Sequence, residues 1–437
     1  MLFKKPKYVC KAAEYSLLFQ PSGEVMACHY NRGYVLGFYP NDSIHDIWYG
    51  KKRSYLVKSI RSGKFDTSCH FCKSAIEQNF IHKAGINKYD YIVPDKHKMP
   101  VSMEFQLDNI CNLECIMCSG EYSSQIRKNR EKGEPYFSPY DDNFVDQLKP
   151  FIPYLKQASF TGGEPFLFEV YYKIWDLMKT LNPDIQLYIS SNGTILNDKV
   201  KSYLEQLNFN LTISIDSLNK SNYERIRKNA ILENSLENIN YYIEYCKRKE
   251  MTFNIKSLVT PQNYKDIPEL IEFCNHNQIN FIPKTVLVPG FANFSFSDTK
   301  EVESAIDLLN NLVKESISEI NNQNYNRIIE IKIELDNIKT AQINTQIEEN
   351  AISTERLKTL LIENILLSNK LVKNNKPDDY YREKLDLLFS YSDNENELRT
   401  AIISFSQIPP DILISEFNRS DIRKLCERFK QSGKSKV

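Results

Sequence analysis

The sequence predicts an α/β protein with a parallel sheet, and two observations support that fold class. From about residue 100 to 290, short runs rich in β-branched and aromatic residues alternate with amphipathic helical segments, which is typical of parallel strands covered by helices. Polar or glycine-bearing segments follow the first four of these runs. Because functional residues of parallel barrels lie where the strands end, these segments predict a site at one face of the sheet.

Six strands and their covering helices can be placed by pattern. The expected strands are Val101–Leu107, Gln157–Phe160, Gln186–Ser190, Asn210–Ile215, Thr252–Val259 and Asn280–Leu287. The segment 166–181 repeats apolar residues at helical spacing and predicts a helix with one buried face. Beyond about residue 295 the pattern indicates a run of helices, for instance Glu301–Glu315 and Arg356–Asn369.

Length and composition limit the classes of function. A chain of 437 residues exceeds the usual size of one core, so two or three folding units are expected. The formal net charge of zero gives no indication of a nucleic-acid or membrane partner. No apolar run is long enough to span a membrane, and the first residues lack an apolar signal core, so we expect a cytoplasmic protein.

Three closely spaced cysteines are the most informative motif of the chain. They follow the first strand as Cys111-x3-Cys115-x2-Cys118. Soft thiolates at this spacing suit a [4Fe–4S] cluster, but a fully ligated cube needs four protein ligands and the nearest other cysteine is Cys72. The pattern therefore indicates a cluster with one open iron. A structural zinc site or three unrelated buried thiols are the alternatives.

This loop, together with the later segment Thr161-Gly162-Gly163-Glu164-Pro165, resembles the radical S-adenosylmethionine (SAM) enzymes, whose signature is CxxxCxxC with a downstream GGEP. The resemblance implies a partial (β/α)6 TIM-type barrel. It also implies that the open iron binds SAM, and that reductive cleavage of SAM gives a 5′-deoxyadenosyl radical which abstracts hydrogen. An electron donor such as flavodoxin or ferredoxin would then be a partner.

The same resemblance implies a set of SAM-binding residues. Gly162, Gly163 and Glu164 would contact the methionyl amino group through backbone and acid, although a plain strand-to-helix turn is the alternative. Arg227, in the stretch after Asp216-Ser217-Leu218, would pair with the SAM carboxylate. Further short polar residues at strand ends can hydrogen-bond a ribose or an amino-acid group, or serve as helix caps. They are Ser190, Asn192, Ser214 and Asp216.

A second cysteine set lies near the N-terminus. Cys10, then Gly23 four residues before Cys28, then Cys69-x2-Cys72, resembles part of the SPASM/twitch auxiliary-cluster modules. The departures are a smaller number of cysteines and a position before the barrel. These four cysteines would ligate a second [4Fe–4S] cluster fully, and a zinc site is the alternative. His29 and His70 adjoin these cysteines, but loop histidines are more often simple surface residues.

We therefore expect three parts: residues 1–85 as the auxiliary module, 98–295 as the radical SAM barrel and 296–437 as a helical region. On analogy with enzymes of this kind, the predicted substrate is a peptide or protein side chain. Oxidation or epimerisation of a carbohydrate or small molecule is one alternative. A non-catalytic iron–sulfur or zinc protein is the other. Neither the catalytic residues nor the reaction outcome can be assigned from the sequence.

Overall fold

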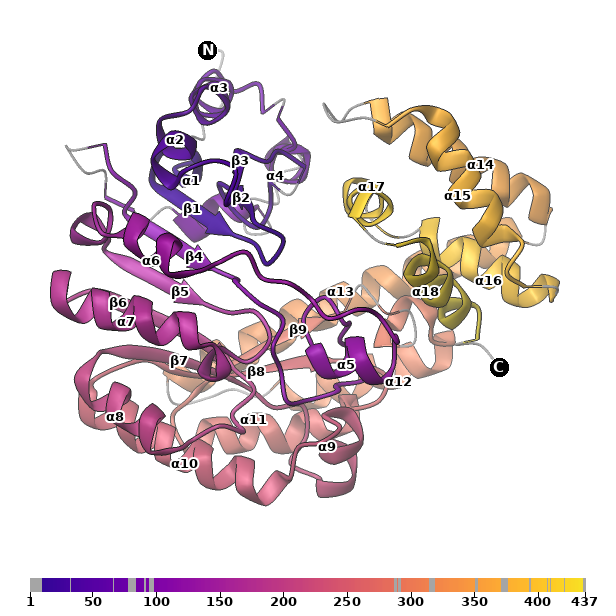
Figure 1. The fold of residues 1–437 in the computed structure, drawn as a ribbon. Helices are drawn as coiled ribbons and strands as arrows, with labels where there is room; N and C mark the ends of the chain where they lie inside the picture. Colours follow the sequence, from indigo (N-terminus) through magenta and orange to yellow (C-terminus); the bar gives the residue numbers. More distant parts are fainter. Residues whose placement is uncertain are drawn as a thin grey trace, which may run out of the picture.

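The structure, a computed structural model, describes residues 10–434 apart from 32, 66, 78–83, 90–91, 94–97, 287–288, 290–291, 314–318, 350–352, 371–375, 393, 407, 409 and 420. Within those residues a sheet of nine strands has the order β3-β2-β1-β4-β5-β6-β7-β8-β9 (Figure 1). The strands are β1 Ser16–Phe19, β2 Glu24–Met26, β3 Gly37–Phe38, β4 Ser102–Phe105, β5 Gln157–Phe160, β6 Gln186–Ser191, β7 Phe209–Ser214, β8 Phe253–Val259 and β9 Asn280–Thr285.

The strands β4 to β9 form the predicted parallel sheet. Each pairs in parallel with the next, and β3 and β9 remain at the two ends of the strand order, so the barrel is open. The α/β class and the partial barrel are therefore confirmed. The helices between these strands are α5 Ser124–Asn129, α6 Asp142–Leu148, α7 Glu169–Leu181, α8 Asp198–Gln206, α9 Lys220–Ile226, α10 Leu232–Lys249 and α11 Ile267–His276. Leu287, the last residue of the sixth predicted strand, lies outside the described residues.

The N-terminal segment extends the same sheet. β1 pairs in parallel with β4, while β2 and β3 follow as an antiparallel pair. Its helices are α1 Ala12–Tyr15, α2 Ile44–Tyr49, α3 Lys51–Arg61 and α4 His70–Glu77. One sheet thus contains strands from both the expected auxiliary module, residues 1–85, and the expected barrel, residues 98–295. The division of the chain between these two parts stays a prediction.

Short 3₁₀ turns join several of these elements. They are η2 Gly85–Tyr89, η3 Ile152–Tyr154, η4 Pro165–Leu167, η5 Tyr264–Asp266 and η7 Phe294–Phe296. η4 begins directly after Gly162-Gly163-Glu164, so the glycines lie on a strand-to-helix turn between β5 and α7.

The outer face of the sheet is apolar and packs on the helices. Phe19, Phe105 and Phe160 are aligned in register on three neighbouring strands. Their rings stack with centroids 5.4 Å and 5.0 Å apart. α7 covers this face with Trp175, whose ring meets Phe160 edge-on, and all four side chains are fully buried. Period-2 alternation places this row on one side of every strand.

The inner face is polar. In β8 the outward Ile255 and Val259 are buried, whereas the alternating Asn254 and Lys256 are only partly buried. Asn254 Nδ2 donates to Thr212 Oγ1 on the neighbouring strand at 3.2 Å. A closed TIM barrel fills this interior with branched apolar side chains, so the polar interior marks a space open to a ligand.

The C-terminal helices divide into two groups. α12 Thr299–Leu312 and α13 Glu319–Glu349 pack with the barrel core, and α13 lies against β9. Asn324 and Arg327 on α13 hydrogen-bond the backbone of residues 279 and 281 at 2.6–2.9 Å. The remaining helices share a separate apolar core and form a bundle, drawn in yellow tones in Figure 1. They are α14 Thr354–Lys370, α15 Asp378–Phe389, α16 Glu395–Ser406, α17 Pro410–Arg419 and α18 Ile422–Lys434.

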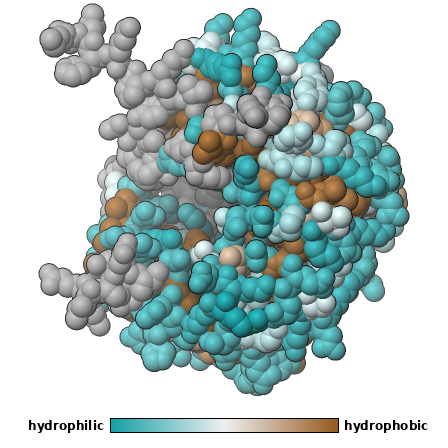
Figure 2. Space-filling model, turned by 90° about the vertical axis from the view of Figure 1, so that its left-hand side faces the viewer, coloured by the Kyte–Doolittle hydropathy of each residue, from teal (hydrophilic) through white to brown (hydrophobic). Residues whose placement is uncertain are grey.

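The face of the molecule in Figure 2 is mainly hydrophilic, with hydrophobic residues in scattered patches. Among the described helices, none is both long and apolar enough to cross a bilayer.

Candidate functional site

The three clustered cysteines lie on the loop between β4 and α5. The side chains of Cys111, Cys115 and Cys118 line one cavity of about 1790 Å³. The backbone of the loop runs beside the segment after α9: Glu114 N donates to the carbonyl of residue 228 at 3.0 Å. Ile116 N donates to the carbonyl of residue 226 at 2.9 Å. The structure therefore brings the three predicted ligands together at one cavity wall.

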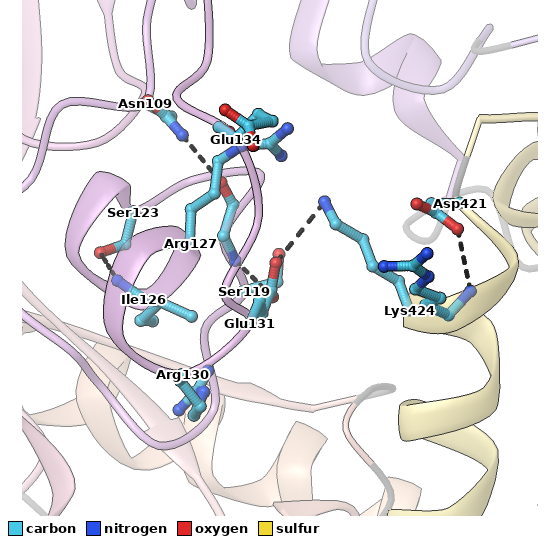
Figure 3. A network of polar contacts seen from close by, with 12 residues as sticks. Asn109, Ser119, Ser123, Ile126, Arg127, Arg130, Glu131, Glu134, Asp421 and Lys424 are labelled. Atoms are coloured by element: carbon cyan, nitrogen blue, oxygen red, sulfur yellow. Dashed lines mark hydrogen bonds and ion pairs between the residues drawn. The ribbon is translucent and has the colours of Figure 1, made fainter.

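Charged side chains hold this loop beside the C-terminal bundle (Figure 3). Arg130 donates to the backbone carbonyls of Cys115, at 3.3 Å, and Cys118. Glu131 Oε1 accepts from Gly120 N at 2.7 Å, while its Oε2 lies 3.5 Å from Lys424 Nζ of α18. One glutamate thus connects the cysteine loop to the bundle.

Burial sets the protonation of the three thiols. It raises the pKa of Cys111 and of Cys118 to about 12 and raises the pKa of Cys115 as well. The thiols of the free chain are therefore neutral at pH 7, and binding of a metal cluster must release their protons.

The donor set fits an iron–sulfur cluster with one open iron. Three thiols are the soft ligands that a [4Fe–4S] cluster prefers, and no fourth cysteine lines this cavity among the described residues. No three His, Cys, Asp or Glu side chains of the described chain gather closely enough to hold a single metal ion. The arrangement is thus not a preformed tetrahedral zinc site.

Gly162 and Gly163 also line the cavity, and packing requires both to lack a side chain. Gly162 has a φ of +125°, a conformation that L side chains rarely adopt. A Cβ on Gly163 would lie 2.1 Å from the carbonyl oxygen of Ile110. The two glycines therefore let the β5 turn press against the backbone just before Cys111.

Glu164 joins two neighbouring strand ends. Its carboxylate is fully buried and accepts from Ser191 Oγ at 2.9 Å and Asn192 N at 2.8 Å. Burial raises the pKa of Glu164 to about 7, although the hydrogen bonds from Ser191 and Asn192 act in the opposite direction. In this structure the acid is thus satisfied within the chain, and its contact with SAM stays a prediction.

Ser190, Asn192 and Ser214 line the same cavity. Asn192 Nδ2 donates to Asn112 Oδ1 at 3.0 Å and lies 3.8 Å from Cys111 Sγ. The end of β6 is therefore in contact with the cysteine loop, while the two serines present hydroxyl groups to the cavity.

Asp216 and Arg227 form a buried ion pair instead of acting separately. Arg227 Nη2 lies 2.7 Å from Asp216 Oδ2, and both side chains are more than nine-tenths buried. Burial opposes the charge of Arg227, but Asp216 outweighs it and raises the pKa of the guanidinium. Arg227 lines the cavity, whereas Asp216 does not, so the aspartate positions the arginine from behind.

The four N-terminal cysteines also meet. Cys10, Cys28, Cys69 and Cys72 line a cavity of about 20 Å³, roughly the space of one water molecule. Burial, followed by the neighbouring Cys10 and Cys69, raises the pKa of Cys28 far above its usual value. The set offers four thiols, the number that closes a [4Fe–4S] cluster, and the side chains would have to separate to admit it.

A buried carboxylate links this module to the barrel. Glu104 on β4 lies 2.9 Å from His29 Nε2, accepts from Lys88 at 2.5 Å and accepts from Tyr89 at 2.7 Å. Burial opposes its ionisation, but His29 and Lys88 hold its pKa at about 2. His29 is therefore not a simple surface histidine.

Two segments of the chain that contain these cysteine sites match models of known protein families. The model of the radical SAM superfamily matches residues 106–274, and the model of the SPASM iron–sulfur cluster-binding domain matches residues 10–73. This chain carries a radical SAM domain with a SPASM domain before it. The radical SAM domain implies a [4Fe–4S] cluster and SAM, and the SPASM domain implies auxiliary iron–sulfur clusters.

Curated relatives share the radical SAM region. An uncharacterized protein of Methanocaldococcus jannaschii is 30% identical over 168 residues, covering 38% of this chain and 54% of that protein. A GTP 3′,8-cyclase of Clostridium perfringens is 32% identical over 168 residues, which cover 38% of this chain and 48% of that protein. The chain thus spans about half the length of the curated relatives it matches. Streptococcus suis SuiB bound to S-adenosylmethionine aligns with a TM-score of 0.36 at 17% identity, over 60% of this chain and 62% of that chain.

Sequence reasoning missed several residues around the radical SAM domain. They are Arg130 and Glu131, which hold the cysteine loop, Glu104, which joins the two modules, and Lys256, which lines the cavity from β8. Glu104 and Lys256 have one signal in common, because each is a charged residue inside a predicted strand with a buried residue on either side.

Proposed function

We propose that this protein is a radical SAM enzyme that cleaves S-adenosylmethionine reductively and abstracts hydrogen from a peptide or protein side chain. One observation carries the proposal. The three cysteines of the loop, the Gly162-Gly163 turn and strand-end side chains from β6 and β7 all line a single cavity. The predicted cluster ligands and the predicted SAM-binding groups thus line one space, as a reaction at an open iron requires.

The residues of this chain would bind and orient the two cofactors. Cys111, Cys115 and Cys118 would ligate three irons, which leaves the fourth for SAM. When bound, the reduced cluster would supply the electron that breaks a carbon–sulfur bond of SAM. Gly162 and Gly163 would let the ligand approach the backbone closely, and Arg227 would offer a guanidinium to its carboxylate.

The size of the cavity favours a peptide substrate. Small-molecule sites usually enclose about 300–1,000 Å³, whereas this cavity measures about 1790 Å³. It extends from the cysteine loop to the C-terminal bundle, where Ile414, Glu416 and Arg428 line it. A bulky substrate could enter between the barrel and the bundle.

A small-molecule substrate is the second candidate, because the matched Clostridium perfringens relative is named a GTP 3′,8-cyclase. We also propose a cytoplasmic site of action with flavodoxin or ferredoxin as the electron donor, since thiolate-bound clusters need a reducing compartment.

The test is formation of 5′-deoxyadenosine from SAM by the anaerobically reconstituted, dithionite-reduced protein, with iron counted on the same sample. We expect product together with about eight irons, the total for two cubes. Cys111→Ala should abolish cleavage. Cys246→Ala is the matched control, because Cys246 is buried in α10 and lines neither cysteine cavity.

The auxiliary site has its own variant. Cys69→Ala should lower the iron content by about four, the number in one cube, and should impair substrate turnover while sparing SAM cleavage. Absence of cleavage by the wild-type protein, with zinc or only four irons bound, would instead favour a non-catalytic binding protein.

A further inference from the structure

One buried amide side chain lies among the four N-terminal cysteines. Asn31 follows Cys28 by three residues and lines the small cavity that it shares with Cys10, Cys28, Cys69 and Cys72. Its side chain is only 1% exposed. A polar group at that depth is costly unless hydrogen bonds compensate for its burial, so its partners indicate what the side chain does.

The two hydrogens of this amide have two different acceptors. Asn31 Nδ2 donates to the carbonyl oxygen of Thr67 at 2.7 Å and to Cys69 Sγ at 2.9 Å. A carbonyl oxygen can only accept, so it fixes the nitrogen end of the amide toward this segment. The second hydrogen is thereby directed at the sulfur. At the other end, Oδ1 is buried without a partner among the described residues, so it is the donors of this side chain that the fold uses.

The same amide connects two cysteine segments. The backbone N of Asn31 donates to the carbonyl of Cys28 at 3.3 Å, which ties it to the first segment. Thr67 and Cys69 belong to the second segment, and Ser68 between them has a φ of +57°, which residues other than glycine rarely adopt. Such a conformation persists only where neighbouring contacts hold it. Asn31 therefore helps to fix the place of Cys69 relative to Cys28.

A donor of this kind interacts more strongly with a thiolate than with a thiol. The sulfur of a thiol is a weak acceptor, whereas hydrogen bonds to ionised groups are about twice as strong as those between neutral groups. A cysteine that ligates a cluster is deprotonated, and the negative charge on its sulfur increases when the cluster takes up an electron. A hydrogen bond to that sulfur thus stabilises the reduced cluster more than the oxidised one.

We propose that Asn31 is a positioning residue of the auxiliary cluster, and that its hydrogen bond to the sulfur of Cys69 raises the reduction potential of that cluster. The inference rests on the proposed function, in which Cys69 is a cluster ligand, and deepens it. Reduction adds one electron to the cluster, and Asn31 keeps both of its protons. The auxiliary cluster therefore accepts an electron more easily with Asn31 than without it.

The reduction potential of the auxiliary cluster tests this role. It is measured anaerobically on the reconstituted protein by a redox titration that follows the electron paramagnetic resonance signal of the reduced cluster. All samples carry Cys111→Ala, because this background should lack the loop cluster, whose signal would overlap. Asn31→Leu removes the donor and keeps a side chain of similar size. It should make the equilibrium constant for reduction about tenfold smaller, the value of one hydrogen bond to a charged group, so the potential becomes more negative by about 59 mV for one electron.

Two further variants separate this effect from a loss of structure. Asn324→Ala is the matched control, because Asn324 is also a fully buried asparagine with three hydrogen bonds, yet it lies on α13 and lines neither cysteine cavity. It should lower the melting temperature without changing the potential. Asn31→Asp has nearly the same shape as the wild type but replaces the donor with an acceptor, so it should also make the potential more negative. Iron content verifies that each variant holds its cluster.

The outcomes separate this inference from the proposed function. A potential that is unchanged in both Asn31 variants overturns the inference, and so does loss of the cluster from both, since Asn31 would then serve assembly. Zinc at this site overturns it as well, because zinc has no redox chemistry. If the wild-type protein forms no 5′-deoxyadenosine while Asn31→Leu still lowers the potential, SAM cleavage is wrong and the role of Asn31 stands.

Discussion

The outer and inner faces of the same strands carry different side chains. On the outer face, Phe19, Phe105 and Phe160 stack in register and are fully buried. On the inner face, one residue before Phe105 in β4, Glu104 binds charged partners. Burial of aromatic area stabilises the sheet from outside, whereas the inside keeps polar groups that an apolar core would exclude. Substitutions on the two faces should therefore affect different properties.

The largest effect on stability is expected from the outer face. Phe105→Ala removes the middle ring of the stack, and cavity formation should cost about 3–5 kcal/mol of the free energy of unfolding. Urea denaturation measures this loss. Phe137→Ala is the matched control, because that ring is 87% exposed and should change stability little. A loss below about 1 kcal/mol for Phe105→Ala would contradict the packing role.

The buried ion pair is the point at which the inner face does affect stability. Asp216→Asn leaves the charge of Arg227 buried without its partner, which should cost about 3 kcal/mol. Adding Arg227→Met removes that charge and should recover part of the loss, measured by the same denaturation. Wild-type stability of Asp216→Asn would contradict the role of the pair in the free energy of unfolding.

Ser214→Ala should separate the effect on stability from the effect on SAM cleavage. Its hydroxyl faces the cavity, so the free energy of unfolding should change by no more than about 0.5 kcal/mol. Formation of 5′-deoxyadenosine at limiting SAM should fall about two- to tenfold, the value of one hydrogen bond. Ser304→Ala, on the exposed side of α12, is the control. If Ser214→Ala lowered stability and spared product formation, the inner face would be structural.

The smallest effect is expected at the rim between barrel and bundle. Lys424→Met removes the contact with Glu131, and a partly exposed pair at 3.5 Å is worth about 0–1 kcal/mol. The difference in melting temperature from the wild type should shrink further in about 1 M salt, because screening weakens such pairs. A large loss that salt does not reduce would mean that the bundle depends on this contact.

The sequence predicts elements whose signal is local. The six strands β4 to β9 appear as short apolar runs with helices between them, and all six are confirmed. β1 was not predicted as part of the sheet, because its partner β4 lies far along the chain. Pairing between distant segments leaves no periodicity to read. The division at residues 85, 98 and 295 remains a prediction for the same reason.

For the site, spacing and strand ends located the residues but not their partners. The three loop cysteines, the glycine turn and the serines of β6 and β7 all line the cavity. The pairing of Asp216 with Arg227 could not be predicted, since the two belong to different segments that only the fold brings together. Lys256 was missed because a single lysine in a strand resembles a solvated residue.

The contact of α13 with β9 has a consequence for fragments of this protein. Asn324 and Arg327 occupy backbone donors and acceptors along the free side of β9, where another strand could otherwise pair. A fragment that stops at residue 295 would keep all the barrel strands but lose this cover. Its exposed strand would then offer a template for pairing between molecules, so such a fragment should self-associate during folding even though every predicted cluster ligand is present.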